Sequence, residues 1–190
     1  MNRERREFIL GGQKSGKSRR AEALAGGWLN ASPDHCAVLI ATAQPWDDEM
    51  RERITRHQVD RAERAPGMVT LEEPRALADA LRRGSEPQTL VVVDCLTLWL
   101  TNLMMPADQA QALDDAGVSA ATEALCEAIT SARGPVVLVG NEIGLGVIPM
   151  GREVRAFVDA LGQLNQAVAA ACDRVTLMAA GLPLVLKGAA

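Results

Sequence analysis

The chain has 190 residues, of which 48% are hydrophobic, a composition that supports one globular domain with a sizeable core and excludes a disordered protein. Its net charge of −4, with acids and bases interspersed, argues against nucleic acid as the main partner. No run approaches the roughly 20 apolar residues of a membrane-spanning helix, and charged residues dominate the first seven positions, where a secretory leader would begin. We therefore expect a cytoplasmic protein without a membrane span.

The first motif is a glycine-rich turn between two apolar segments. We expect residues 1–7 to be a frayed terminus, 8–10 to be a strand and 19–29 to be a helix. The turn has the spacing Gly-x4-Gly-Lys-Ser of a phosphate-binding loop, whose backbone N–H groups and following helix end attract a polyphosphate. A chance match is the alternative, but the strand before and the helix after favour nucleotide binding. The residues predicted to bind the phosphates are Gly11, Gly12, Gln13, Lys14, Ser15, Gly16, Lys17 and Ser18.

Two side chains of this loop have specific predicted roles. Lys17 is expected to reach the β- and γ-phosphates, and Ser18 to ligate Mg²⁺. The next strand is predicted at 37–41, because a continuous apolar run is typical of a strand buried on both faces. The loop that leaves it, beginning with Thr42, can line a nucleotide crevice at the carboxyl edge of the sheet.

The helix predicted at 47–64 has few apolar residues, which indicates an exposed or projecting helix. Glu49, Arg53, His57 and Arg61 recur every four residues and therefore share one face. Two arginines beside an imidazole would hold a phosphate next to it, and neutral imidazole is a competent nucleophile toward phosphorus. A surface histidine with no role is the alternative interpretation of His57.

The remaining elements alternate between strands and helices. A short strand at 68–71 and a helix ending at residue 83 precede a buried strand at 90–94, which ends in Asp94. In phosphate-loop proteins such an acid lies near the magnesium ion; the alternative is that Asp94 caps the helix at 95–103. A third buried strand at 136–140 delivers Asn141 and Glu142. Helices at 114–133 and 151–172 and closing strands at 174–179 and 184–187, around a turn at 181–183, complete the chain.

This alternation predicts an α/β fold of the P-loop NTPase (RecA-like) type. A single domain spanning 1–190 would contain one mostly parallel sheet with helices on both faces. Right-handed crossovers would bring the phosphate-binding loop, Thr42, Asp94, Asn141 and Glu142 to one edge. The four cysteines lack a CxxC pair and only two histidines are present, so we expect buried reduced thiols and no zinc site.

A phosphate-binding loop alone leaves a kinase, an NTPase, a switch or a nucleotidyltransferase open. Further motifs stand in one order along residues 8–187: Ile40-Ala41-Thr42-Ala43; Asp47-Asp48-Glu49-Met50 with Arg53-Ile54 and His57; Asp94-Cys95-Leu96-Thr97 with Thr101-Asn102-Leu103; residues 141–149; and Arg155, Phe157, Asp159, Gly162, Asn165 and Gln166. With these motifs the chain resembles the bifunctional adenosylcobinamide kinase/adenosylcobinamide-phosphate guanylyltransferase family of coenzyme B12 biosynthesis.

The resemblance implies two reactions. ATP or GTP donates its γ-phosphate to the hydroxyl of the aminopropanol arm of adenosylcobinamide. A histidine, here His57, then attacks the α-phosphate of GTP, releases pyrophosphate and passes GMP to adenosylcobinamide phosphate, giving adenosyl-GDP-cobinamide. Family members form homo-oligomers, and a trimer is the implied state. Besides the phosphate-binding loop, the implied GTP-binding residues are Ala41, Thr42, Ala43, Gln58, Val59, Asp60, Arg61, Glu72 and Asp94, with Ser18 and Asp94 at Mg²⁺.

Three positions depart from the family pattern. Lys14 stands where the family has arginine, so a forked phosphate contact becomes a point-charge contact. Arg61 is followed by Ala62 in place of proline, and residues 63–67 are slightly longer than usual, which changes the spacing to Glu72. Two other functions stay open from the residues alone: a P-loop kinase or NTPase of another small molecule without covalent GMP, and a nucleotide-binding regulatory module without catalysis.

Overall fold

The computed structural model describes residues 5–189, in which seven strands form one sheet of order β3-β2-β4-β5-β1-β6-β7. The first six strands in the chain run parallel and β7 pairs antiparallel to β6. The strands are β1 (Arg6–Gly11), β2 (Cys36–Ala41), β3 (Val69–Glu72), β4 (Thr89–Asp94), β5 (Val136–Val139), β6 (Arg174–Ala179) and β7 (Leu182–Lys187).

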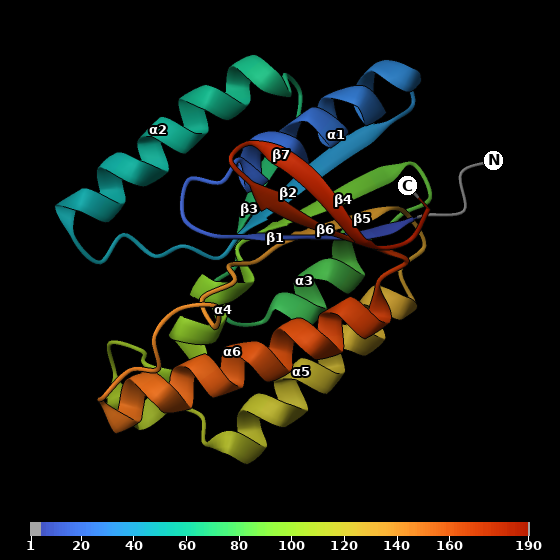
Figure 1. The fold of residues 1–190 in the computed structure, drawn as a ribbon. Coiled ribbons are helices and arrows are strands. Elements are labelled where there is room, and N and C mark those ends of the chain that lie inside the picture. Colours follow the sequence, from blue (N-terminus) through green and yellow to red (C-terminus); the bar gives the residue numbers. More distant parts are fainter. Residues whose placement is uncertain (1–4, 190) are drawn as a thin grey trace.

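Helices cover both faces of this sheet, as predicted (Figure 1). The helices are α1 (Lys17–Ala31), α2 (Asp48–Arg64), α3 (Leu77–Gly84), α4 (Leu96–Met104), α5 (Asp115–Thr130) and α6 (Arg152–Ala171), with the 3-10 turn η1 (Gln109–Gln111). Helix α1 packs on one face and carries α2 on its outer side, whereas α3, α4, α5 and α6 lie on the opposite side. None of the helices within residues 5–189 is long and apolar enough to cross a membrane.

The alternation of side chains along the buried strands divides the core into two parts. Phe8 packs with the residues of α3 to α6, whereas its neighbour Ile9 packs with those of α1. In β4 the same alternation places Val91 on one side and Val92 on the other. The central residues 8–10 of β1 and 90–93 of β4 are all apolar, because a parallel strand at the centre of a sheet is covered on both faces.

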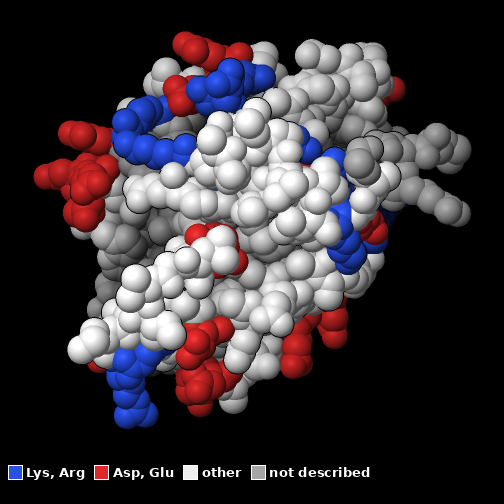
Figure 2. Space-filling view, viewed as in Figure 1, with Lys and Arg blue, Asp and Glu red and all other residues white. Residues whose placement is uncertain are grey.

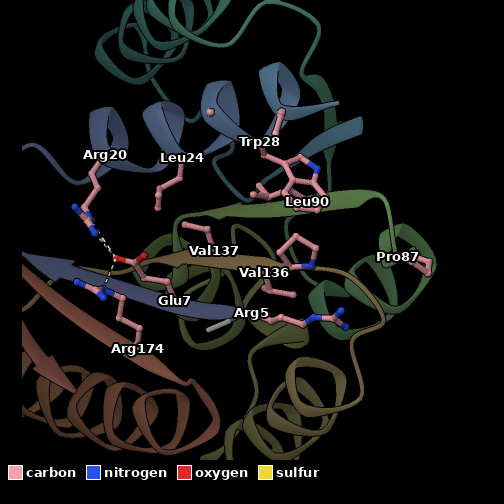
Figure 3. Close-up of a pocket in the computed structure, with 13 residues that line it drawn as sticks. Arg5, Glu7, Arg20, Leu24, Trp28, Pro87, Leu90, Val136, Val137 and Arg174 are labelled. Carbon is pink, nitrogen blue, oxygen red and sulfur yellow. Dashed lines mark hydrogen bonds and ion pairs between the residues drawn. The ribbon is translucent and has the colours of Figure 1, made fainter. Parts of the chain in front are cut away.

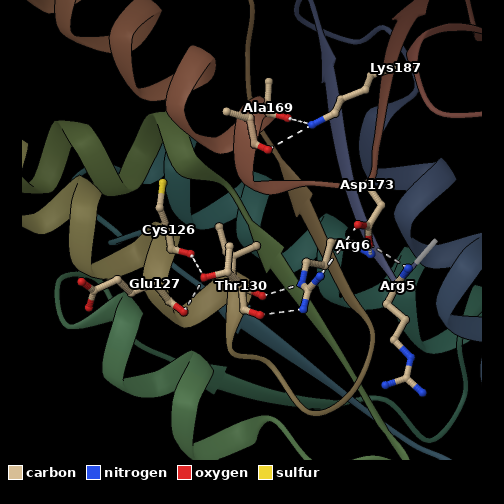
Figure 4. Close-up of polar contacts among 10 residues, drawn as sticks. Arg5, Arg6, Cys126, Glu127, Thr130, Ala169, Asp173 and Lys187 are labelled. Atoms are coloured by element: carbon tan, nitrogen blue, oxygen red, sulfur yellow. Dashed lines mark hydrogen bonds and ion pairs between the residues drawn. The ribbon is translucent and has the colours of Figure 1, made fainter. Parts of the chain in front are cut away.

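The prediction that residues 1–7 fray is wrong for Arg6 and Glu7, which belong to β1. Figure 4 shows the reason for Arg6: its guanidinium donates hydrogen bonds to the carbonyl oxygens of Ile129 and Thr130, both at 2.7 Å. The backbone N–H of Arg6 also donates to the Asp173 carboxylate at 3.0 Å. All of these partners lie more than 120 residues away, and residues 1–4 of the predicted terminus lie outside the described part of the chain.

The closing hairpin is present, but its turn lies earlier than predicted. Ala180 and Gly181 form the turn, with φ of 52° and 80°, and β7 begins at Leu182. Pro183 therefore belongs to the strand, where it is paired with Met178. An edge strand tolerates this proline because it has no second neighbour that would need an N–H group.

Candidate functional site

The phosphate-binding loop connects β1 to α1 through backbone conformations that favour glycine. Gly11 has φ of 154° and Gly16 has φ of 101°. A Cβ on Gly11 would lie 2.5 Å from the carbonyl oxygen of Met178, so the loop passes too close to β6 to carry a side chain there. Gly16 is the N-cap residue of α1, so the loop leads directly into the free N–H groups at the helix start.

Lys17 and Ser15 are the buried polar side chains of this loop. Lys17 is 8% exposed, and its Nζ donates to the carbonyl oxygen of Gly12 at 2.6 Å. The Ser15 hydroxyl is buried without a hydrogen-bond partner among residues 5–189. An ammonium group and an unsatisfied hydroxyl beside a helix N-terminus suit phosphate oxygens. Gly12, Gln13 and Lys14 are exposed to solvent.

A cavity of about 390 Å³ lies at the carboxyl ends of β2, β3 and β4. The register of the sheet brings three strand ends together there, because Ala41 is paired with Glu72 on one side and with Asp94 on the other. The prediction of a shared carboxyl edge is therefore correct for these strands. The predicted site residues that line this cavity are Ser18, Ala41, Ala43, His57, Gln58, Arg61, Glu72 and Asp94.

The polar helix α2 supplies the opposite wall of this cavity. Asp47 caps the helix by accepting a hydrogen bond from the N–H of Met50 at 2.7 Å. His57 is half-buried and faces the cavity together with Arg61, which is only 8% exposed. The predicted stripe is thus present for these two side chains. Glu49 is exposed and is not part of the wall, and the side chain of Arg53 lies outside the described residues.

Three residues that the resemblance implies lie elsewhere. Thr42 is fully buried behind the cavity. Val59 is 57% exposed and does not line the cavity, and the Asp60 carboxylate pairs with Arg64 at 3.2 Å. Neither Val59 nor Asp60 lines the cavity, so a nucleotide contact by either residue stays a prediction.

Arg51 is a cavity residue that the sequence prediction missed. Arg51, Thr55 and Gln58 all line the cavity at spacings of four and three residues along α2. This spacing is a second helical stripe, adjacent to that of His57, and it could have revealed Arg51. A stripe of every fourth residue covers only one edge of the helix face that lines the cavity, so it omits Arg51.

Thr42 holds Asp94 in place through the backbone. Its hydroxyl donates to the carbonyl oxygen of Cys95 at 2.8 Å and accepts from the N–H of the same residue at 2.9 Å. The N–H of Thr42 donates to the carbonyl oxygen of Asp94 at 3.1 Å. The N-cap residue of α4 is Cys95, without a capping side chain, so the alternative that Asp94 caps this helix is not supported.

Ser18 and Asp94 fit the oxygen chemistry that Mg²⁺ requires. Both line the same cavity, and together they offer a hydroxyl and a carboxylate. Mg²⁺ in nucleotide sites takes only a few protein ligands and completes its shell with water and phosphate oxygens. Within residues 5–189 no group of three or more His, Cys, Asp or Glu side chains could hold a metal ion by itself.

Asn141 and Glu142 reach the predicted edge but stay outside the cavity wall. The N–H of Glu142 donates to the carbonyl oxygen of Gly11 at 3.2 Å, which places the end of β5 directly against the phosphate-binding loop. The N–H of Asn141 donates to the hydroxyl of Thr97 at 2.9 Å. These contacts make the two residues structural neighbours of the loop.

A second, larger hollow of about 640 Å³ lies at the opposite, amino edge of the sheet (Figure 3). Within it, the Glu7 carboxylate lies 2.9 Å from Arg20 and 3.8 Å from Arg174. None of the predicted site residues lines it. Ligands of parallel α/β sheets bind at the carboxyl ends of the strands, so the smaller cavity is the candidate site.

Comparison with known proteins finds the family that the sequence resembles. A family model described as cobinamide kinase / cobinamide phosphate guanyltransferase matches residues 7–186. The bifunctional adenosylcobalamin biosynthesis protein CobP of Pseudomonas aeruginosa is 49% identical over 183 residues, which cover 96% of this chain and 98% of that protein. The corresponding protein CobU of Escherichia coli is 36% identical, over 95% of this chain and 98% of that protein.

Solved structures with a similar fold are distant in sequence. The flagellar accessory protein FlaH from Methanocaldococcus jannaschii has a TM-score of 0.52 at 10% identity, over 96% of this chain and 78% of that chain. A second solved structure, the ATPase domain of another protein, has a TM-score of 0.53 at 13% identity, over 93% of this chain and 70% of that chain. These likenesses confirm the predicted fold class. From the full-length match to its model and relatives, this chain belongs to the cobinamide kinase / cobinamide phosphate guanyltransferase family.

Proposed function

We propose that this chain phosphorylates adenosylcobinamide with ATP or GTP and then transfers GMP from GTP to the product through a guanylyl-histidine at His57. The observation that carries this proposal is that His57 lines one cavity together with Asp94 and Ser18. Ser18 lies in the first turn of α1, directly after the phosphate-binding turn. A nucleophile and a phosphate-binding motif then act on the same nucleotide.

In the first reaction, the hydroxyl oxygen of the acceptor forms a bond to the γ-phosphorus. The bond from that phosphorus to the bridging oxygen breaks, the nucleoside diphosphate leaves, and the hydroxyl proton passes to solvent. The loop N–H groups and the buried Lys17 hold the phosphates and offset their charge. Mg²⁺, held by Ser18 and Asp94, would supply further neutralisation of the phosphate charge when bound.

In the second reaction, a ring nitrogen of His57 forms a bond to the α-phosphorus of GTP. The bond to the bridging oxygen breaks and pyrophosphate leaves, while the other ring nitrogen can give up its proton. A phosphate oxygen of phosphorylated cobinamide then attacks the same phosphorus, the P–N bond breaks, the ring takes up a proton, and His57 is restored. Arg61 lies on the same wall with little exposure to solvent, so its guanidinium can offset charge beside the reacting phosphate.

The test is to incubate the purified protein with GTP that carries label in the α-phosphate. We expect protein-bound label that is labile to acid and stable to alkali, as a phosphoramidate is. His57→Ala should abolish it. His35→Ala is the matched control, because the ring of His35 stacks on Trp28 at 3.7 Å between centroids and is not part of the cavity.

If His57→Ala keeps the label, the assignment of the nucleophile is wrong. If the native protein transfers γ-phosphate or hydrolyses nucleotide without any covalent GMP, the alternative of a kinase or NTPase for another substrate is favoured. Nucleotide binding without turnover of any cobinamide substrate would instead indicate a regulatory module.

Two further expectations complete the proposal. The protein is expected to work in the cytoplasm, where ATP and GTP are supplied, and to form a homo-oligomer, with a trimer as the state that the family resemblance implies. Sedimentation velocity of the purified protein checks the second of these, since a monomer of 20.2 kDa and a trimer differ threefold in mass.

A further inference from the structure

The loop between β5 and α6 exposes an unusual run of apolar side chains. Leu145 is 83% exposed, Val147 96%, Ile148 78% and Met150 95%. We call residues 143–150 the apolar loop. Single exposed apolar residues are common on protein surfaces, but a contiguous cluster marks a binding surface. In Figure 2 the place that this segment occupies in Figure 1 is covered mainly by uncharged atoms.

The apolar loop begins beside the phosphate-binding loop. Its preceding residue, Glu142, donates its N–H to the carbonyl oxygen of Gly11 at 3.2 Å, and Gly140 donates to Ile9 at 3.0 Å. A large molecule that lies on the apolar loop can therefore extend from the start of α6 to the phosphate-binding loop.

Internal contacts give the apolar loop a defined shape. At its start, the Glu142 carboxylate accepts a hydrogen bond from the N–H of Gly144 at 2.6 Å. At its end, the guanidinium of Arg155 in α6 donates to the carbonyl oxygens of Pro149 and Met150. A hollow of about 210 Å³ lies within the loop and against α6, and Val158 of α6 is part of its wall. A surface held in this way loses little conformational entropy when a ligand binds.

We propose that the apolar loop binds the macrocycle of the cobinamide acceptor and so places the acceptor hydroxyl beside the phosphate-binding loop. This inference rests on the proposed function, and it names the place of the second substrate. The corrin macrocycle of cobinamide is large and presents methyl groups and ring carbons between its amide side chains, so an apolar surface can bind it. The cavity of about 390 Å³ lies near the lower limit of small-ligand sites, so a bound nucleotide occupies it and the macrocycle must lie outside.

The variants Val147→Asp and Ile148→Asp test this proposal. Both side chains are largely exposed, so a carboxylate there leaves the core intact. Leu186→Asp is the matched control, because its side chain is 55% exposed on the outermost strand β7. Leu186 is far from the apolar loop: its neighbour Lys187 pairs with Val175, at the amino end of β6. Binding of cobinamide, which is coloured, is measured by equilibrium dialysis with no nucleotide present, and KM values are measured in the kinase reaction.

We expect the two loop variants to weaken cobinamide binding and raise its KM about tenfold, with the KM for ATP changed less than about twofold. Leu186→Asp should leave all three values unchanged, and Val147→Leu should behave like the native protein. Sedimentation velocity is run on every variant.

The outcomes separate this inference from the proposed function. If the native protein neither binds nor phosphorylates cobinamide, the proposed function fails and the docking site fails with it. If the native protein does both and the loop variants bind cobinamide equally well, only the docking site is overturned. If affinity is lost only together with a change in sedimentation coefficient, the apolar loop is a contact between copies of the chain, which also overturns the inference.

Discussion

Thr42 is a single buried residue that fixes the backbone at the strand end carrying Asp94. One hydroxyl serves both the N–H and the carbonyl oxygen of Cys95, and the N–H of Thr42 binds Asp94. The side-chain amide of Asn102 in turn donates to the carbonyl oxygen of Thr42 at 2.7 Å. The direction of the Asp94 side chain therefore depends on a hydroxyl that never touches the cavity.

Thr42→Val tests this role with almost no change of volume. The N–H of Cys95 would lose its partner in a buried place, which we expect to cost about 1–3 kcal/mol of the free energy of unfolding, whereas the carbonyl oxygen of Cys95 keeps the N–H of Trp99 at 3.1 Å. Urea denaturation measures this loss. Thr42→Ser keeps the hydroxyl and should retain most of the stability and activity; equal losses in the two variants would contradict the bridging role.

The sequence could reveal residues whose type and spacing match a known chemistry, but not those that act through distant contacts. Asp94 and Ser18 were predicted because a strand end and a loop motif mark them. The hydrogen bonds of Thr42 could not be predicted, because their partner Cys95 lies 53 residues away and joins it only when β2 and β4 pair. The face that His57 shares with Arg61 could be predicted, because a helix repeats its faces regularly.

At the scale of elements, helix α2 is fixed chiefly at its carboxyl end. The guanidinium of Arg64 donates to the buried carboxylate of Glu22 in α1 at 2.7 Å, and this carboxylate raises the pKa of Arg64. Gly26 lets the helices approach, since a Cβ there would lie 2.8 Å from the carbonyl oxygen of Arg64. Ala65, the next residue, is buried at 2% exposure. These contacts attach the carboxyl end of α2, the helix that carries His57, to α1.

Arg64→Ala should lower the rate of covalent GMP formation while leaving kinase activity nearly unchanged, provided that the kinase step uses the phosphate-binding loop without His57. We expect a decrease of about tenfold or more, because small displacements of a reacting group are costly. Arg56→Ala removes an exposed charge from the same helix and is the control. Glu22→Ala combined with Arg64→Ala should lose less than the two single changes together, since the buried Glu22 carboxylate is then not left without its partner.

The character of α2 was predictable, whereas its attachment was not. Its scarcity of apolar residues correctly indicated an exposed helix, because a helix that packs on a sheet needs a broad apolar stripe. The contact with α1 depends on one ion pair and one glycine that the sequence does not distinguish from others. The hairpin of β6 and β7 was predicted with its turn too late, because Pro183 resembles a turn residue although an edge strand also accepts it.

At the scale of the whole molecule, the four cysteines differ in how deeply they are buried. All four are free, and Cys95 and Cys172 are buried, as expected, whereas Cys36 is exposed and Cys126 is half-buried. Burial raises the pKa of Cys172 to about 12 and also raises the pKa of Cys95 and of Cys126. Thiolate is the reactive form, so the buried thiols are protected twice, by lack of access and by protonation.

A thiol titration at pH 8 with an aromatic disulfide should therefore show one fast reaction in the native protein and four in denaturant. The fast thiol is Cys36, and Cys36→Ser should remove that phase alone. The reaction of Cys95 and Cys172 should follow global unfolding in increasing urea. A fast reaction of Cys95 or Cys172 in the native protein would show that the sheet opens more readily than its buried core indicates.

The kind of sheet was predictable from the alternation of apolar runs and helical segments, but its strand order was not. Strands β2, β4 and β5 share a buried apolar centre, so their sequences do not specify their neighbours. The order β3-β2-β4-β5-β1-β6-β7 is set by the lengths and hands of the crossovers and by the packing of α1 and α6. The phosphate-binding loop lies near the centre of the sheet for this reason.

The position of β1 has a consequence for the order in which the protein is completed on the ribosome. This strand is made first, yet its two neighbours are β5, which begins at Val136, and β6. The phosphate-binding loop also depends on the turn before β7, because the N–H of Gly181 donates to the carbonyl oxygen of Ser15 at 3.1 Å. A nascent chain that has been made only as far as α4 therefore contains the whole phosphate-binding motif but lacks β5 and β6, which pair with β1. We expect it to bind nucleotide only after the hairpin of β6 and β7 has been made.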